Sequence, residues 1–510
     1  MNFDDPFTGY SLLLRVIVYG LVPAFALLQF FRYRRALHVF QLEGYKRARF
    51  LEWCRRNRSR AWFLTSAPAK KPLVMTGRAW RILVTATLLT PSLVLVPAGV
   101  VHIGLGGWPL DVATWLVTTA AVFVLTPQVV VLADVLMTPV QRAINARFLR
   151  AARRRLDDVA PTIVGITGSY GKTSTKFAIE RLIGPPGSAL ATPGSFNTPL
   201  GVCRTINERL DDAHRYLVVE MGAYREGDIA ELMAFVRPTI GVLTAIGPVH
   251  LERFGSMEAI RRGKYEVVRD LPEGGVAVMN VDDPEVRSLA DATRHVRVVR
   301  YGLEEDGAPD VTARDVEVHP RGTMFSVVDV RNGSSARVET RLLGKHSIGH
   351  VLAGAAVALE AGRSLDEIAA AAAGLEPVEH RLQLIEGTGG VVVIDDAYNS
   401  NPAGAAAALD VLAAMPAGKK VVVTPGIVEL GERQTEENER FGRRAGEVAD
   451  HVIVVARLNR AALAAGARAG GRAEVIEVDT LAEATERLRT LLAPGDVVLF
   501  ENDLPDQYEG

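Results

Sequence analysis

The sequence predicts an α/β protein with a mainly parallel sheet, preceded by three transmembrane helices. Two observations support this prediction. Three long apolar stretches occur within the first 133 residues, and from Pro161 onward short β-branched runs alternate with helical periods and glycine turns. That alternation is typical of strands joined by crossover helices. At 510 residues and 48% hydrophobic composition, the chain is long enough for several domains.

The apolar stretches are predicted to cross a membrane at about residues 12–31, 82–104 and 112–133. Each reaches the roughly 20 residues that a helix needs to span a bilayer. The alternative is a set of buried helices in a soluble core. Such helices usually carry a polar stripe, which the second and third stretches lack, so we expect spanning helices.

The orientation of these helices follows from the basic residues beside them. Segments 32–81 and 142–155 are both rich in arginine, and basic loops stay on the cytoplasmic side of a membrane. We therefore expect a multi-pass protein of the plasma membrane whose remaining domains are cytoplasmic. Its basic residues are expected to face anionic membrane lipid. The acidic start, with Asp4 and Asp5, lacks the basic region of a cleavable signal, so the first stretch is expected to remain.

Charge and cysteine content exclude several classes of protein. The formal net charge of -1 gives no reason to expect nucleic acid as a partner. The two cysteines, Cys54 and Cys203, are far apart, so neither a disulfide framework nor a cysteine zinc site is expected. This composition fits a reducing compartment.

A phosphate-binding loop is predicted in the run TIVGITGSYGKTSTK, with a strand at 162–166, a glycine loop at 167–171 and a helix that begins near Lys172. Glycines let backbone N–H groups approach phosphate oxygens, a lysine neutralises the terminal phosphates, and a hydroxyl serves magnesium. The loop is a variant of the Walker pattern, because Ile166 replaces its first glycine. The residues expected to bind ATP here are Thr167, Gly168, Ser169, Gly171, Lys172, Thr173 and Ser174.

TGSYGKTSTK is similar to the nucleotide loop of the Mur ligases, the ATP-dependent amide ligases of peptidoglycan-precursor synthesis. FNTPLG, VVEMGA and VHLERFGSMEAIRRGKYE, which follow it up to Glu266, resemble the central ATPase domain of that family. LEPVEHRLQ and DDAYNSNP resemble its C-terminal domain, and the second most resembles the branch that adds D-alanyl-D-alanine. The likeness covers about residues 161–498, or two-thirds of the chain.

The resemblance implies a P-loop central ATP-binding domain and a smaller Rossmann-like C-terminal domain. We expect them at residues 151–378 and 379–510, after a membrane domain at 1–150 whose basic cytoplasmic loop is 32–81. The implied reaction is the ATP-dependent joining of a carboxylate to an amine through an acyl phosphate. The negative charge on the phosphates must be stabilised by cationic groups and metal ions throughout this reaction.

Glu220 ends an apolar run and is expected to hold a first magnesium ion with Thr173 through oxygen ligands. His250 and Lys264, fourteen residues apart as in the family, are implied to serve a second magnesium ion, with Lys264 carbamylated. A strand-end carboxylate, a structural histidine and a solvated lysine are the alternatives. The resemblance also implies that Asn197 contacts the γ-phosphate or the reacting group of the substrate. The expected catalytic residues are Lys172, Asn197, His250 and Lys264.

Residues outside the loop are implied to contact the nucleotide. Arg381 would reach the phosphates from the C-terminal domain, while Asp396 and Tyr398 would contact the ribose or base. Asn280 would line the adenine, although a strand-end turn explains it equally well. Closure of the C-terminal domain over ATP would exclude water from the acyl phosphate.

The chain departs from the family pattern at three places. The family's N-terminal domain, which binds the UDP part of the substrate, has no counterpart before Pro161. GDVVLF is followed by ENDLPDQYEG where a lysine-glycine-serine turn is usual, and Ser347 and His350 stand where asparagines are common. We hypothesise that the membrane anchor replaces this missing substrate-binding domain. It would hold the active site near a lipid-linked or membrane-surface carboxylate and so raise the effective concentration of that carboxylate.

The expected partners are ATP, a muropeptide-like or lipid-linked carboxylate donor, an amino acid or dipeptide as amine acceptor, and membrane lipid. Two alternatives stay open. One is a related ligase that makes a poly-amino-acid or amidates a lipid-linked precursor. The other is a P-loop transport or signalling ATPase, although VVVIDD, the best candidate for its second nucleotide motif, lies in the wrong domain. A catalytically inactive scaffold is disfavoured, because a suitable residue stands at every position expected to bind phosphate or metal.

Overall fold

The computed structural model describes residues 7–58, 61, 72–105, 108–249, 251–398, 400–416, 418–455 and 457–504. The description is limited to the backbone for residues 7–21, 102, 104, 105, 108, 109, 111, 112, 252 and 388. The chain divides into two compact units, Met1–Arg147 and Phe148–Gly510. Each unit is described by itself.

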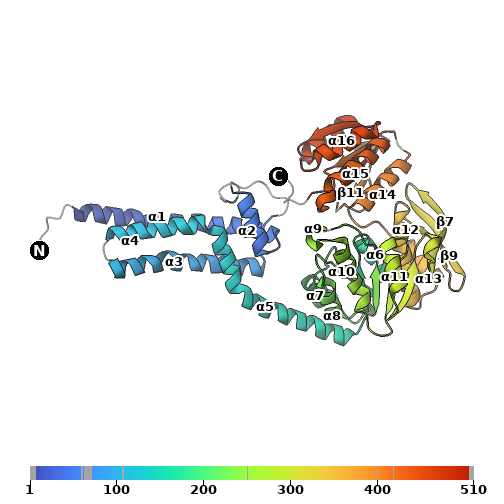
Figure 1. The fold of residues 1–510 in the computed structure, drawn as a ribbon, viewed down its shortest axis with the longest axis horizontal. Helices are drawn as coiled ribbons and strands as arrows, with labels where there is room; N and C mark the ends of the chain where they lie inside the picture. The colour runs from blue at the N-terminus through green and yellow to red at the C-terminus, as the bar shows by residue number, and fades with distance from the viewer. Residues whose placement is uncertain are drawn as a thin grey trace. The chain divides into compact units, whose positions relative to one another are not determined.

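The first unit is built from helices within its described part (Figure 1). These are α1 (Phe7–Leu42), α2 (Arg47–Arg56), α3 (Gly77–Leu105), α4 (Trp108–Val124) and the first part of α5 (Thr126–Val159). Large apolar side chains point outward from them; Leu88 is 70% exposed and Ile103 is 88% exposed. Large apolar side chains exposed in such numbers favour contact with a membrane or a partner.

Two helices in the described ranges, Gly77–Val101 and Thr126–Val159, are long and apolar enough to cross a membrane. The predicted second span lies within α3. The predicted third span is wrong as a single helix, because α4 ends at Val124 and α5 begins at Thr126. Pro127 explains the break, since it has no backbone N–H to donate and is favoured only in the first turn of a helix. The predicted first span lies in α1.

A buried carboxylate ties the helices of the first unit together. Asp134 on α5 is 3% exposed and accepts hydrogen bonds from Arg47 Nε at 2.7 Å and Arg78 Nη2 at 2.9 Å. These side chains come from α2 and α3. Removing either arginine would leave a buried charge with less compensation, which is costly in a protein interior.

The second unit begins with a nine-stranded sheet of order β2-β3-β1-β4-β5-β6-β7-β8-β9. Strands β1 to β7 are parallel and β7, β8 and β9 are antiparallel. The strands are β1 (Thr162–Thr167), β2 (Ala189–Ala191), β3 (Tyr216–Glu220), β4 (Ile240–Leu243), β5 (Val276–Asn280), β6 (Arg297–Tyr301), β7 (Val311–His319), β8 (Gly322–Asp329) and β9 (Ser334–Thr340). The helices are α6 (Lys172–Leu182), α7 (Pro199–Arg209), α8 (Asp228–Val236), α9 (Leu251–Phe254), α10 (Met257–Arg269), α11 (Pro284–Ala292), α12 (His346–Glu360) and α13 (Leu365–Ala372).

A second sheet follows, with strand order β10-β11-β15-β12-β13-β14, in which only β10 is antiparallel to its neighbour. Its strands are β10 (Gln383–Glu386), β11 (Val392–Asp396), β12 (Lys420–Thr424), β13 (His451–Val455), β14 (Glu474–Val478) and β15 (Val497–Glu501). Its helices are α14 (Pro402–Ala414), α15 (Gln434–Val448), α16 (Arg460–Gly470) and α17 (Leu481–Leu491). The predicted α/β class with mainly parallel sheets is confirmed. The predicted boundaries at residues 150 and 378 remain our proposal for the division of the chain.

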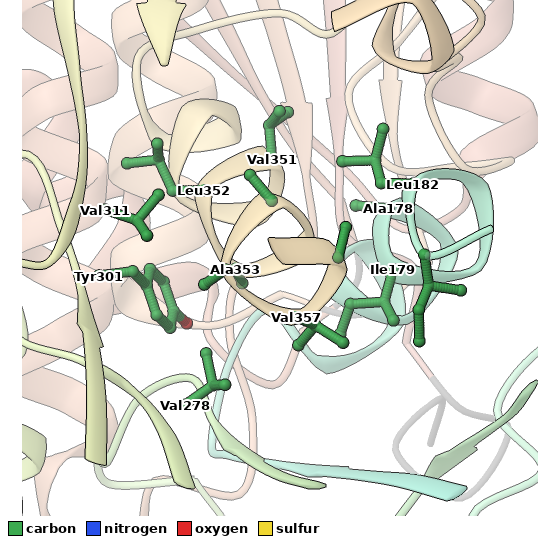
Figure 2. Packing of buried hydrophobic residues seen from close by; sticks show 14 of the residues in the cluster. Ala178, Ile179, Leu182, Val278, Tyr301, Val311, Val351, Leu352, Ala353 and Val357 are labelled. Atoms are coloured by element: carbon green, nitrogen blue, oxygen red, sulfur yellow. The ribbon is translucent and has the colours of Figure 1, made fainter. Parts of the chain in front are cut away.

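Helix α12 holds the phosphate-loop helix α6 against the first sheet. Figure 2 shows Leu352 and Val357 of α12 among side chains of α6 and of the strands. The two helices approach closely at Gly354, where a Cβ atom would lie 2.8 Å from Leu182 Cδ1. Because core packing is dense and transmits strain, α12 fixes the position of α6 and of the loop before it.

Val357→Ala is expected to destabilise the first sheet and its helices by about 2 kcal/mol, through lost burial of two methyl groups and the cavity that remains. Val357 is fully buried in α12. Val330→Ala makes the same change at a turn position that is 49% exposed and is expected to cost under about 0.5 kcal/mol. Denaturant unfolding of the purified chain measures both. Equal shifts of the two midpoints would contradict the core position of α12.

Candidate functional site

The loop between β1 and α6 requires glycine at two positions. Gly168 has φ +155° and a Cβ there would lie 2.0 Å from Thr244 Oγ1. Gly171 has φ +74° and directly precedes α6, where a Cβ would lie 2.9 Å from His350 Cε1. A chain that turns this tightly before a helix presents backbone N–H groups of the helix N-terminus, which suits a phosphate.

Lys172 lies over this loop. Its Nζ donates to the carbonyl oxygens of Gly168 at 2.8 Å and Ser169 at 3.3 Å. Burial lowers the pKa of Lys172, while the carboxylate of Glu220 acts in the opposite direction. The ammonium group is therefore held by neutral carbonyls, which an anionic ligand can replace.

Glu220, at the end of β3, is the centre of the site. It is 1% exposed and accepts hydrogen bonds from Thr173 Oγ1 at 3.0 Å, from Asn197 Nδ2 at 3.2 Å and from Lys176 Nζ at 3.2 Å. Burial alone would raise the pKa of Glu220, but the charges of Lys176 and Lys172 and these hydrogen bonds outweigh it, so the pKa lies below its ordinary value. The carboxylate is therefore ionised at neutral pH.

The pair of Thr173 and Glu220 fits a magnesium ion. Mg²⁺ prefers oxygen ligands and is usually held by one or two carboxylates together with water and substrate phosphates. A hydroxyl and a carboxylate within hydrogen-bond distance supply such ligands. In the described part of the chain no group of three or more His, Cys, Asp or Glu side chains could hold a metal ion, so this fit depends on phosphate oxygens.

Three of the four predicted catalytic residues share one small cavity of about 40 Å³. Lys172, Asn197 and Lys264 line it, together with Ser169 and Tyr224. Lys264 on α10 is 3% exposed, and its pKa is lowered well below the ordinary value by burial and by the charge of Lys172. The fourth predicted residue, His250, lies outside the described residues.

A larger cavity of about 320 Å³ lies beside the loop. Residues from the domain of the first sheet and from the domain of the second sheet line it. Among the predicted nucleotide-binding residues, its lining includes Gly171, Ser174, Asn280, Arg381 and Asp396. Its size is at the lower end of what ligand pockets need. The cavity is therefore a candidate site for the nucleoside part of ATP.

Three other predicted residues lie outside both cavity linings. Thr167 is fully buried and its hydroxyl donates to Met221 O at 2.8 Å, so it supports the loop from behind. Tyr398 donates to Ser195 Oγ at 2.7 Å, and Arg381 stacks over its ring at 4.7 Å. Thr173 accepts a long hydrogen bond of 3.5 Å from Arg381 Nη2.

His350 and Glu501 also line the larger cavity, and neither is among the predicted site residues. His350 hydrogen-bonds Thr175 through Nδ1 at 3.0 Å, and burial lowers its pKa to about 3, so its imidazole is neutral. Glu501 ends β15 beside Asp396. The departure from the family's asparagine pointed to His350, whereas nothing in the sequence indicated that β15 pairs with β11.

Comparison with known proteins places two family models on this part of the chain. Residues 166–358 match the Mur ligase middle domain, and residues 380–501 match the domain described as Mur ligase, glutamate ligase domain. The UDP-N-acetylmuramoyl-tripeptide–D-alanyl-D-alanine ligase of Mycobacterium leprae is 37% identical over 383 residues, which are 70% of this chain and 74% of that enzyme. The enzyme of the same name from Escherichia coli is 33% identical and covers 59% of this chain and 66% of its own length.

Solved structures agree with this match. MurF from Acinetobacter baumannii superposes with a TM-score of 0.63 at 27% identity, covering 71% of this chain and 78% of that one. The MurF ligase of Thermotoga maritima in complex with ADP gives a TM-score of 0.63 at 29% identity, covering 72% and 82%.

Glu220→Gln is expected to destabilise the fold by about 3 kcal/mol at neutral pH, because it leaves Lys176 as a buried charge without a carboxylate. The pKa of Glu220 is lower in the folded chain than its ordinary value of 4.5. The ionised carboxylate therefore stabilises the fold above that pH, and this contribution is lost as the pH falls through the folded pKa.

Unfolding of wild type and variant between pH 8 and pH 4 measures this difference. It should be constant near neutrality and shrink at the acid end. Glu339→Gln, which removes an exposed carboxylate on β9, should leave stability nearly unchanged. A Glu220→Gln effect that grows with acidity would contradict the assignment.

Proposed function

The chain belongs to the Mur ligase family of ATP-dependent, amide-bond-forming ligases, and we propose that it acts on a muropeptide-like carboxylate in peptidoglycan-precursor synthesis, as a D-alanyl-D-alanine-adding enzyme. The names of the relatives at 37% and 33% identity support this choice. The geometry that most directly supports ATP-dependent amide-bond formation is at Glu220. Thr173 and Asn197 both donate hydrogen bonds to Glu220, beside a cavity lined by Lys172 and Lys264.

In the first step a substrate carboxylate oxygen attacks the γ-phosphorus of ATP, and the bond from that phosphorus to ADP breaks. Lys172 would leave its loop carbonyls to neutralise the transferring phosphoryl group, and loop N–H groups would bind the phosphates. Asn197, held by Glu220 at 3.2 Å, would orient the reacting oxygen. The product of this step is an acyl phosphate and ADP.

In the second step the acceptor amine attacks the acyl carbon, inorganic phosphate leaves, and the amine loses a proton. Mg²⁺ would neutralise charge on the phosphates, with Thr173 and Glu220 as its protein ligands. A second ion would use His250 and a carbamylated Lys264. The low pKa of Lys264 favours this modification, because only a neutral amine reacts with carbon dioxide.

The C-terminal domain would bring Arg381, Asp396 and Tyr398 to the nucleotide. Direct contacts already join it to the middle domain near the loop. Arg253 on α9 pairs with Glu429 at 2.7 Å, and Tyr398 donates to Ser195. Closure of the two domains around the nucleotide would exclude water, which otherwise hydrolyses an acyl phosphate.

We further propose that the first unit anchors the enzyme in the plasma membrane, with the catalytic domains in the cytoplasm. Exposed apolar side chains on α3 and two candidate spans support this location. Arginines near the helix ends would bind anionic lipid head groups. An anchored active site would act at high effective concentration on a donor that is lipid-linked or held at the membrane surface.

Purified full chain given ATP, D-alanyl-D-alanine and a UDP-linked or lipid-linked tripeptide should yield a product whose mass corresponds to one new amide bond. Lys172→Ala should lower the rate at least about 100-fold, because it removes a cation that stabilises the transferring phosphoryl group. Lys419→Ala, which removes an exposed lysine of the C-terminal domain, should leave the rate within about twofold.

The same assay separates the alternatives. An amide product with other acceptors only would indicate a poly-amino-acid or amidating ligase. Phosphate release at full rate without donor or acceptor would favour a transport or signalling ATPase and would sink the ligase proposal.

Carbamylation of Lys264 can be tested without turnover. Protein equilibrated with ¹³C-bicarbonate should show one carbamate resonance that is absent from Lys264→Arg. Lys420→Arg serves as control, since Lys420 lies on β12 in the other sheet. A spectrum of the wild type without any carbamate signal would contradict the modification.

A further inference from the structure

Two carboxyl groups lie side by side at the wall of the larger cavity. Asp396 and Glu501 are register partners at the carboxyl ends of the adjacent parallel strands β11 and β15. The two carboxyl groups interact electrostatically, since each shifts the pKa of the other. Both residues line the cavity that also contains Gly171 and Ser174 of the phosphate loop and helix. Ligands of open α/β sheets bind at this end of the strands.

One buried oxygen of Glu501 lacks a hydrogen-bond donor among the described residues, and a proton shared with Asp396 would supply one. Glu501 is fully buried, and its Oε1 accepts from Ser400 Oγ at 2.5 Å. With both carboxyls ionised, Oε2 would be a buried acceptor with no donor among the described residues. Such a group is costly to bury. One proton between Glu501 Oε2 and Asp396 removes that cost, because it makes one carboxyl a donor to the other.

The charges around the pair indicate which member holds the proton. Burial raises the pKa of Asp396 to about 6, against the opposing effect of Arg381, and Asp395 adds to the increase. Burial and the neighbouring Asp396 raise the pKa of Glu501 well above its ordinary value. Glu501 is fully buried, whereas Asp396 is half-buried and is stabilised as an anion by Arg381. We therefore assign the proton to Glu501 and the negative charge to Asp396.

The segment after β15 is built to hold this arrangement. Asn502 has φ +69°, its amide Nδ2 donates to Gly426 O at 2.5 Å, and its Oδ1 accepts from Ser400 N at 3.2 Å. Its backbone N donates to Asp396 O at 3.2 Å. A non-glycine residue in the left-handed region persists only where its surroundings fix it, and such residues gather at functional sites.

Asp396 keeps the capacity to accept from a ligand. Its Oδ1 accepts from Leu382 N at 3.1 Å, and each carboxylate oxygen has two lone pairs. In a nucleotide the ribose joins the phosphates to the base, and its hydroxyls are donors that acidic side chains recognise at strand ends. A carboxylate beside the phosphate loop is placed to accept from one of them.

We propose that Glu501 is a positioning residue for ribose recognition, which donates the shared proton to Asp396 and so fixes the Asp396 carboxylate as the acceptor for a ribose hydroxyl. This inference rests on the proposed function, because it takes the cavity as the ATP site. It assigns a role to the first residue of the ENDLPD segment, where the sequence departs from the family pattern.

Calorimetric binding of ADP, 2′-deoxyADP and 3′-deoxyADP to the purified full chain tests the proposal. Wild type should bind ADP at least about 10-fold more tightly than one of the deoxy analogues, the range expected for a hydrogen bond to a charged acceptor. Glu501→Ala should reduce this preference to under about threefold. Glu501→Gln should restore it, because the amide N–H replaces the shared proton and the amide oxygen still accepts from Ser400.

Asp503→Asn is the matched control, since it removes an exposed carboxylate two residues away and should leave the preference unchanged. A preference that survives in Glu501→Ala, or that Glu501→Gln fails to restore, overturns the proposal, as does wild-type binding without ribose preference. Because nucleotide binding needs neither donor nor acceptor, a ribose preference without amide formation would count against the proposed function alone. Absence of ADP binding to wild type would overturn both.

Discussion

The site depends on one buried carboxylate that is kept ionised. Glu220 sits at the end of β3 with hydrogen bonds from α6 and from the segment before α7. A lone carboxylate in this position would be strongly disfavoured, and Lys176, itself fully buried, compensates for it. The same charge draws Thr173 and Asn197 inward. The loop, the proposed metal ligands Thr173 and Glu220, and Asn197 are thus held by a single electrostatic arrangement.

That arrangement needs a loop whose backbone cannot move far. Gly168 and Gly171 allow the chain to pass close to Thr244 and His350, and α12 presses α6 against the sheet through Gly354. The dense packing there supplies the rigidity that a preorganised phosphate site requires. The C-terminal domain adds Arg381 and the Asp396–Glu501 pair, so both domains line the proposed nucleotide cavity. The proposed phosphate and metal-binding residues lie in the middle domain alone.

Local sequence patterns predicted the residues whose roles follow from their position along the chain. A strand, a glycine turn and a lysine at a helix start indicated Lys172 and Thr173, and a carboxylate at a strand end indicated Glu220. Asn197 and Lys264 came only from the family resemblance, because nothing local distinguishes them from a turn asparagine and a helix lysine. The third predicted span was wrong as one helix, since hydropathy does not register the break that Pro127 imposes between α4 and α5. Glu501 could not be found at all, because its meeting with Asp396 depends on β15 inserting between β11 and β12.

We infer that the loop, Thr173 and Glu220 together bind one magnesium-bound triphosphate. A structure of the full chain with Mg²⁺ and a non-hydrolysable ATP analogue tests it most directly. We expect the metal at about 2.1 Å from oxygens of Thr173 and Glu220, with Lys172 Nζ turned from the loop carbonyls to the terminal phosphate. A nucleotide bound away from this loop would contradict this inference. So would a metal ion bound elsewhere while Glu220 accepts only from Lys176 and the other protein donors.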